Sequence, residues 1–159
     1  MMKTRQGIGP VLVMLALGAI GPGKARAAAD DAVGLWRTED GKGLIEMFSC
    51  GERLCGRLAG FTPRPGTTGV PVDDNNPDPV RRTQLLCGLM LMGDFRRTAE
   101  GAWEDGWIYD PKSGQTYHAT VRPDGPDRLR LRGYVGIPLF GQTQVWTRAP
   151  ANAPRCKVS

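Results

Sequence analysis

The chain has 159 residues, of which 40% are hydrophobic and 23% are charged, and it carries a formal net charge of +5 at pH 7. This length suits one domain with one core. Four of the 21 basic residues lie before Ala28 and no acidic residue does, so the rest has 17 basic against 16 acidic residues. A balance this close to neutral argues against nucleic acid as a partner.

The first 27 residues are predicted to be a secretory signal peptide. Lys3 and Arg5 precede an apolar run over residues 8–20, and the small-x-small sequence of residues 25–27 suits cleavage before Ala28. The apolar run is shorter than the roughly 20 residues that a membrane-spanning helix needs. We therefore expect a mature domain of residues 28–159 that is periplasmic or secreted and does not span a membrane.

The mature region alternates apolar and polar residues with the period of a β-strand. In RLRLRGYV (128–135), for example, Leu129 and Leu131 face one way and the arginines face the other. Eight such runs are expected, over residues 33–38, 43–50, 54–61, 88–97, 102–110, 115–121, 128–135 and 139–148. Short turns rich in Gly, Asp and Pro separate most of them, which favours an antiparallel up-and-down barrel over a sandwich.

Four cysteines in the mature region favour an oxidising compartment. Their spacing lacks the C-x-x-C pattern of zinc sites, so no metal is expected there. Three disulfide pairings are open. The favoured one joins Cys50 to Cys55 across a hairpin and Cys87 to Cys156, which would tie down the C-terminal tail.

One connection is long, from Thr62 to about residue 87, and contains DDNNPDPVRR (73–82). An EF-hand calcium loop is excluded because Pro79 replaces the required glycine and Leu85 the final glutamate. A looser calcium site and a pair of catalytic carboxylates stay as alternatives. We favour an ordered turn in which Asp78 caps a short helical stretch. Arg81 or Arg82 would then pair with Asp73 or Asp74.

Aromatic residues concentrate in AWEDGWIYDPKSGQTY (102–117). Strict alternation places Trp103, Asp105, Trp107 and Tyr109 on one face, with Tyr117 beside them. On an inner face they would pack as core or line a cavity in which Asp105 is a buried polar anchor. On an outer face they would form a patch for sugars or a partner.

Two short signatures, GLW at residues 34–36 and WTR at 146–148, resemble the G-x-W and arginine signature of lipocalin-like (calycin) barrels. The longer series GLWRTEDGKGLIEMFSCGERLCGRL, DDNNPDPVRR, GAWEDGWIYDPKSGQTYHA and LRLRGYVGIPLFGQTQVWTR resembles, in order and spacing, a bacterial secreted family known as domain of unknown function 2147. This resemblance implies an eight-stranded lipocalin-like barrel in which Trp36 closes one end and Arg148 packs across it. Gly34 belongs to the same signature. The resemblance implies no established activity.

The predicted function is therefore non-enzymatic binding of a small apolar or amphipathic ligand inside the barrel, without a cofactor or metal. The expected contact residues are Trp103, Trp107, Tyr109 and Tyr117, with Asp105 as anchor and Asn76, Asp78 and Arg81 at the mouth. Two alternatives stay open. One is a hydrolase that acts on envelope glycan or lipid with loop carboxylates, and the other is a filled barrel that binds a protein partner through its surface.

Overall fold

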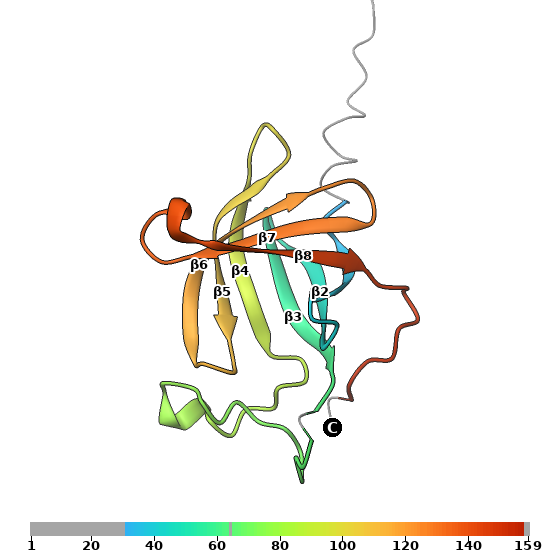
Figure 1. The fold of residues 1–159 in the computed structure, drawn as a ribbon, viewed down its shortest axis with the longest axis vertical. Helices are drawn as coiled ribbons and strands as arrows, with labels where there is room; N and C mark the ends of the chain where they lie inside the picture. The colour runs from blue at the N-terminus through green and yellow to red at the C-terminus, as the bar shows by residue number, and fades with distance from the viewer. Residues whose placement is uncertain (1–30, 64, 158–159) are drawn as a thin grey trace, which may run out of the picture.

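The structure is a computed structural model that describes residues 31–63 and 65–157 (Figure 1). The predicted signal peptide and its cleavage site lie outside these residues. Within them, no helix has the length and apolar character needed to cross a membrane.

The described chain forms eight β-strands and two short 3₁₀ helices. The strands are β1 (Gly34–Arg37), β2 (Gly43–Cys50), β3 (Arg53–Phe61), β4 (Met90–Arg97), β5 (Trp103–Asp110), β6 (Gln115–Pro123), β7 (Arg128–Tyr134) and β8 (Gln142–Arg148). Helix η1 (Pro79–Arg81) lies in the long β3–β4 connection, and η2 (Pro138–Phe140) lies in the β7–β8 hairpin. The last strand therefore begins later than residue 139, where the sequence predicted it, because η2 occupies that position.

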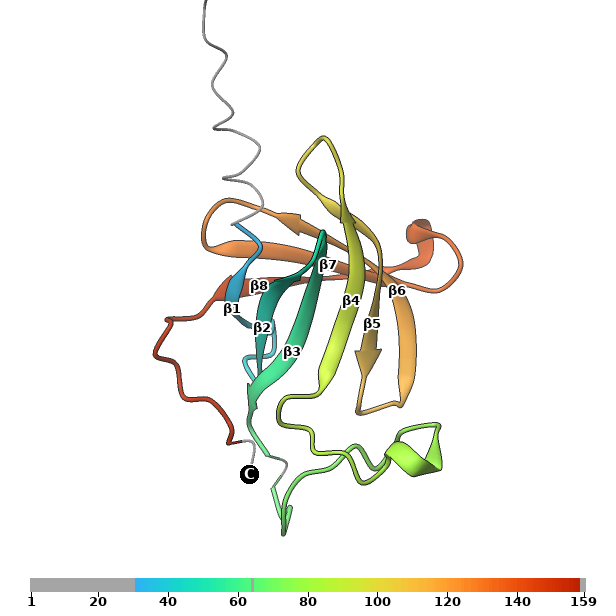
Figure 2. The same ribbon diagram turned by 180° about the vertical axis from the view of Figure 1, so that it is seen from behind.

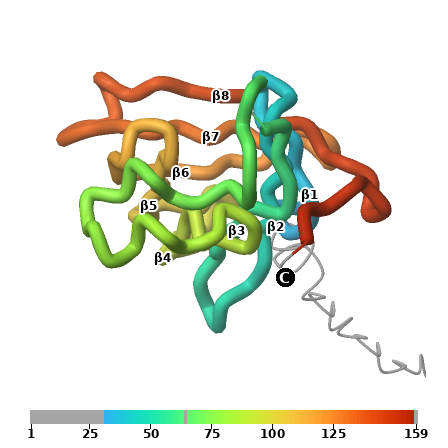
Figure 3. The backbone as a smooth tube through the Cα atoms, turned by 90° about the horizontal axis from the view of Figure 1, so that it is seen from below, coloured from blue at the N-terminus to red at the C-terminus, as the bar shows by residue number. Residues whose placement is uncertain are grey.

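The eight strands close into a barrel. Each strand pairs with the next along the chain, and β1 pairs antiparallel with β8, with Trp36 opposite Arg148. This confirms the predicted up-and-down barrel. One end, which we call the open end, carries the β1–β2, β5–β6 and β7–β8 turns and the long connection, which crosses this end in Figure 3. The opposite end, which we call the closed end, carries the other three turns.

Trp36 fills the closed end of the barrel. Its ring is fully buried, its indole N–H donates to the carbonyl of Ala32 (2.9 Å), and the guanidinium of Arg148 lies 4.2 Å from the ring centroid. Arg148 also donates to three backbone carbonyls, those of Asp31, Val33 and Pro126. Gly34 has φ 129°, and a Cβ there would lie 2.7 Å from Arg148. Cation–π contact and hydrogen bonds thus hold this end shut.

Large side chains occupy the interior next to Trp36. Those that are 5% exposed or less include Met47, Leu54, Phe95, Trp103, Val121, Leu129 and Trp146. They come from seven different strands, so the closed half of the barrel is a packed core. Burying each such side chain stabilises the fold by about 1.5–3 kcal/mol.

The C-terminal tail covers a second apolar cluster outside the barrel, as Figure 2 shows for the red segment beside β1–β3. This cluster consists of Leu35, Leu44, Ala59, Ala149 and Ala153. The N–H of Cys156 donates to the carbonyl of Ala59 (2.8 Å). The tail is therefore an integral part of the fold.

Two disulfides confirm the favoured pairing of the cysteines. Cys50 bonds Cys55 within the β2–β3 hairpin, and Cys87 bonds Cys156. The second bond fastens the C-terminal tail to the last residues of the long connection. The C-terminal end of that connection is thus anchored beside β3, where Gly88 also donates its N–H to the carbonyl of Leu58 (2.8 Å).

Strands β4 and β5 contain irregularities that break strict alternation. Asp94 and Asp105 adopt φ of 62° and 58°, in the left-handed region that non-glycine residues rarely occupy. The β5–β6 register shifts between Trp103 and Gly106. The three-residue advance from Trp103 to Gly106 on β5 lies opposite a two-residue advance on β6, from Val121 to Ala119. Such a bulge reverses the inward and outward positions that follow it.

Candidate functional site

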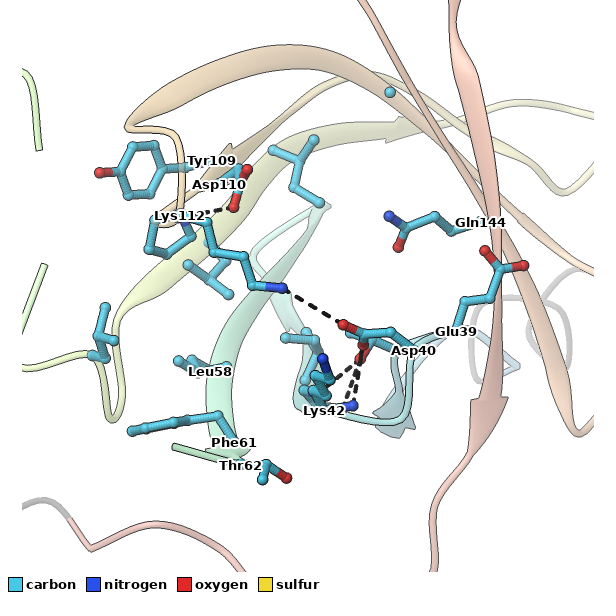
Figure 4. A pocket seen from close by; sticks show the side chains of 18 of the residues that line it. Glu39, Asp40, Lys42, Leu58, Phe61, Thr62, Tyr109, Asp110, Lys112 and Gln144 are labelled. Carbon is cyan, nitrogen blue, oxygen red and sulfur yellow. Dashed lines mark hydrogen bonds and ion pairs between the residues drawn. The ribbon is translucent and has the colours of Figure 1, made fainter. Parts of the chain in front are cut away.

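A cavity of about 1320 Å³ lies at the open end of the barrel (Figure 4). It is bounded by the inner faces of the strands, the three open-end turns and the long connection. Ligand pockets typically measure about 300–1,000 Å³, so this space with its mouth suits a molecule of drug or lipid size. The barrel is therefore packed in its closed half and hollow in its open half.

The deep part of the cavity is mainly apolar. Its side chains include Ile45, Leu58, Leu91, Ile108, Leu131 and Trp146. Two polar groups face the same space: Gln144 accepts the indole N–H of Trp146 (2.9 Å), and the hydroxyl of Tyr117 donates to Gln115 (3.0 Å). An apolar lining with a few fixed polar groups is typical of sites for small apolar or amphipathic molecules.

Charged side chains surround the mouth of the cavity. Lys112 Nζ, on the β5–β6 turn, lies 3.5 Å from Asp40 Oδ2, on the β1–β2 turn (Figure 4). Asp40 also accepts hydrogen bonds from the hydroxyl of Thr38 (2.7 Å) and the N–H of Lys42 (3.1 Å). The hydrogen bond from Thr38, the one from Lys42 and the charge of Lys112 together lower the pKa of Asp40. This ion pair is exposed, so it contributes only about 0–1 kcal/mol.

A buried carboxylate fastens the long connection to β5. Asp73 is fully buried and accepts hydrogen bonds from the hydroxyl of Tyr109 (2.8 Å) and from Asn76 Nδ2 (2.6 Å). Burial, then the hydrogen bond to Asp73 and its charge, raises the pKa of Tyr109 to about 12. Asn75 adds a bond from its Nδ2 to the carbonyl of Lys112 (3.1 Å). We call Asp73, Asn76 and Tyr109 the loop latch.

The stretch at residues 73–82 forms the ordered turn that the sequence favoured. Asp78 caps η1 by accepting the N–H of Val80 (3.0 Å), and Pro79 takes the first helical position. Asn76 is buried, and its Oδ1 accepts the N–H of Asp78 (2.9 Å). Asn76 and Asp78 were expected at the mouth, but they shape the turn and do not line the cavity.

The expected pairing of the two arginines with Asp73 or Asp74 is wrong. Arg81 Nε lies 3.5 Å from the carboxylate of Asp78, the N-cap of η1, and Arg82 Nε donates to the backbone carbonyl of Asn76 (2.8 Å). Arg81 also lies outside the cavity, whereas Asp74 contributes to its rim. Both arginines stabilise the turn locally.

The expectation that Asp105 is a buried anchor is also wrong. Its side chain is 65% exposed and lies 3.3 Å from Arg96. Trp107 lies outside the core as well, and its indole N–H donates to the carboxylate of Asp94 (2.8 Å). The bulge at Asp105 causes both differences, because it turns Asp105 and Trp107 outward after an inward Trp103.

The remaining aromatic residues divide between the two halves of the barrel. Trp103 is 5% exposed and belongs to the closed-end core. Tyr109 and Tyr117 line the cavity. Sequence reasoning missed the aliphatic lining and Gln144, although their inward positions follow from alternation in regular strands. It also missed the burial of Asp73, for which the sequence carries no signal.

Metal binding finds no support among the described residues. In residues 31–63 and 65–157, no group of three or more His, Cys, Asp or Glu side chains is placed to hold an ion. His118 is exposed and stacks on Tyr134 with ring centroids 5.7 Å apart.

Comparison with known proteins identifies the fold and the family. The lipocalin-family protein HP1028 from the human pathogen Helicobacter pylori is similar in structure, with a TM-score of 0.66 and 19% identity over 75% of this chain and 83% of that one. At this identity the likeness shows a lipocalin-like fold alone. No curated protein matches the sequence. A family described as "Uncharacterized protein conserved in bacteria (DUF2147)" matches residues 34–148, which span the whole barrel, and the chain therefore belongs to this bacterial family.

Proposed function

We propose that the protein binds a small apolar or amphipathic molecule in the cavity at the open end of the barrel. The observation that carries this proposal is the cavity itself, about 1320 Å³ in volume, with an apolar interior and a polar, charged mouth. A barrel that only served as a scaffold would gain stability by filling this space with side chains, as the closed half does.

The apolar part of the ligand would lie against Ile108 and Leu131, with Tyr117 between it and the mouth. Ile108 and Tyr117 are directly opposite each other on β5 and β6, so their side chains share the inner face. A polar end would reach the rim, where Lys112 and Gln144 offer hydrogen-bond donors. Tyr109 would contact the ligand where the long connection meets β5.

Export to the periplasm or beyond belongs to the same proposal. Two disulfides in one small domain support an oxidising compartment, because cytosolic proteins keep their thiols reduced. An extracytoplasmic binding protein for apolar molecules would carry them through water.

A cavity-filling variant tests the proposal. Ile108→Trp places an indole in the cavity, while Val145→Trp makes the same kind of change on the outer face, opposite the exposed Arg130. The probe is 1-anilinonaphthalene-8-sulfonate, an amphiphile whose fluorescence rises in apolar sites. We expect saturable binding of the probe to the wild type and to Val145→Trp. Binding to Ile108→Trp should be at least about tenfold weaker, because the indole takes the place of apolar contacts that the probe would otherwise make.

Two results would contradict this proposal. One is equal affinity for both tryptophan variants, which would place the probe outside the cavity. The other is no saturable binding to the wild type, together with the absence of any co-purified mass in native mass spectrometry. Far-UV circular dichroism and thermal unfolding of each variant would show that the barrel is intact.

A further inference from the structure

The large apolar side chains that the described residues expose are confined to one end of the molecule. They are Val70, Val80, Met90, Val135, Ile137, Leu139 and Phe140. All lie in open-end loops or, for Met90, at the first residue of β4, which also starts at that end. Scattered exposed apolar residues are ordinary, but a set gathered at one end marks an interaction surface.

Four of these residues form the tip of the β7–β8 hairpin. Val135, Ile137, Leu139 and Phe140 are 71%, 53%, 76% and 78% exposed, and we call them the apolar tip. No charged residue occurs between positions 133 and 147 of the sequence. Figure 1 shows this hairpin projecting beyond the barrel wall beside β6. A hairpin that projects in this way can insert its apolar side chains into another surface.

Part of the backbone of the hairpin around the apolar tip is hydrogen-bonded within the hairpin. The guanidinium of Arg132 donates to the carbonyls of Pro138 (2.7 Å) and Leu139 (3.2 Å). The N–H groups of Phe140 and Gly141 donate to carbonyls three residues earlier (3.3 and 3.0 Å), and proline has no N–H. These bonds fix the conformation of the η2 turn, which carries Leu139 and Phe140.

The size and charge of this surface also favour lipid over protein. A stable protein interface takes about 20–30 residues from each partner, far more than this tip presents. Arg132 lies at the base of the hairpin and directs its hydrogen bonds to neutral carbonyl and hydroxyl oxygens, so its positive charge is available to anionic headgroups. An apolar tip above a cationic base complements an anionic membrane surface.

The tip is continuous with the mouth of the cavity. Val135 and Phe140 line the cavity as well as being exposed, and Val70 of the long connection does so from another side. Insertion of the tip would therefore bring the mouth against the bilayer surface.

We propose that the apolar tip inserts into the interfacial region of a membrane that contains anionic phospholipid and so docks the open end of the barrel on it. The attachment does not depend on an occupied cavity, so it stands apart from the proposed ligand binding. If the ligand is a lipid, docking would place the cavity at its source; only that step rests on the proposed function.

Vesicle flotation tests the docking. The protein would be purified from the periplasm of an expression host, its N-terminus verified by mass, and mixed with vesicles of phosphatidylethanolamine and phosphatidylglycerol. We expect the wild type to float with the vesicles and Leu139→Ser/Phe140→Ser to bind at least about tenfold more weakly, since two apolar side chains no longer enter the bilayer. Met90→Ser, a matched change of an exposed apolar residue away from the tip, should bind within about twofold of the wild type.

Any of the following three outcomes would overturn the docking proposal. Wild-type protein that stays with the soluble fraction, or a double variant that floats like the wild type, would show that the tip does not insert. Sedimentation without vesicles that reveals a dimer lost in the double variant would make the tip a contact between two copies instead. Ile108→Trp should still float, so loss of probe binding with intact flotation would overturn only the ligand proposal.

Discussion

Replacing Tyr109 with phenylalanine removes one hydrogen bond from the loop latch and leaves the size of the side chain almost unchanged. The tyrosine hydroxyl is one of two side-chain donors to the fully buried carboxylate of Asp73. A buried acceptor that loses its partner costs about 1–3 kcal/mol. We expect Tyr109→Phe to lower the free energy of unfolding by about this amount at pH 7.

The same hydroxyl gives the prediction a pH dependence. The pKa of Tyr109 is raised from 10.0 to about 12 by burial and by Asp73, so the folded protein holds this proton more tightly than the unfolded chain does. The stabilisation is fully present below about pH 10, falls as the pH rises from there, and is lost above about pH 12. Two pKa units correspond to about 2.7 kcal/mol, an upper value because Tyr109 is only partly buried.

Urea denaturation followed by circular dichroism at pH 7 and at several values between about pH 9.5 and 11.5 would measure both effects. The difference between wild type and Tyr109→Phe should be largest at pH 7 and shrink as the pH rises. Tyr117→Phe is the matched control, because that hydroxyl bonds an exposed glutamine and its loss should cost less than about 0.5 kcal/mol. Equal stability of wild type and Tyr109→Phe at pH 7, or a difference that stays constant with pH, would refute the reasoning.

Three further changes have defined expected results in the same denaturation assay. Serine at both Cys87 and Cys156 should cost about 4 kcal/mol, because the bond closes a loop with a sequence separation of 69; a loss below about 1 kcal/mol would contradict this. Gly106→Ala should cost about 3 kcal/mol, since its Cβ would collide with the ring of Phe95, and a neutral effect would show that the ring can move. Lys112→Gln should change the free energy of unfolding by less than about 0.5 kcal/mol. An NMR titration of the same variant should show a higher pKa for Asp40, which loses the positive charge beside it.

The sequence predicted the parts of the fold that depend on local patterns. Alternation located all eight strands. Turn chemistry located the cap at Asp78 and the short helix after it. These features depend on neighbours in the chain, so a single sequence carries them.

The parts that the sequence did not predict depend on partners far away in the chain. The bulge at Asp105 arises from pairing with β6 and reverses the faces of Asp105 and Trp107. An aspartate in a Pro- and Gly-rich loop is ordinarily solvated, yet Asp73 is buried because Tyr109 reaches it from β5. No local pattern distinguishes Asp73 from the exposed acids beside it.

The strength of the contacts around the mouth indicates where a ligand would enter the cavity. On one side the long connection is held by the loop latch, which contains a fully buried carboxylate, and by the disulfide of Cys87. On the other side the β1–β2 and β5–β6 turns are joined by the exposed pair of Asp40 and Lys112. Separating that pair costs about 1 kcal/mol or less, whereas releasing the connection would cost several times more. Access to the cavity is therefore least costly between these two turns.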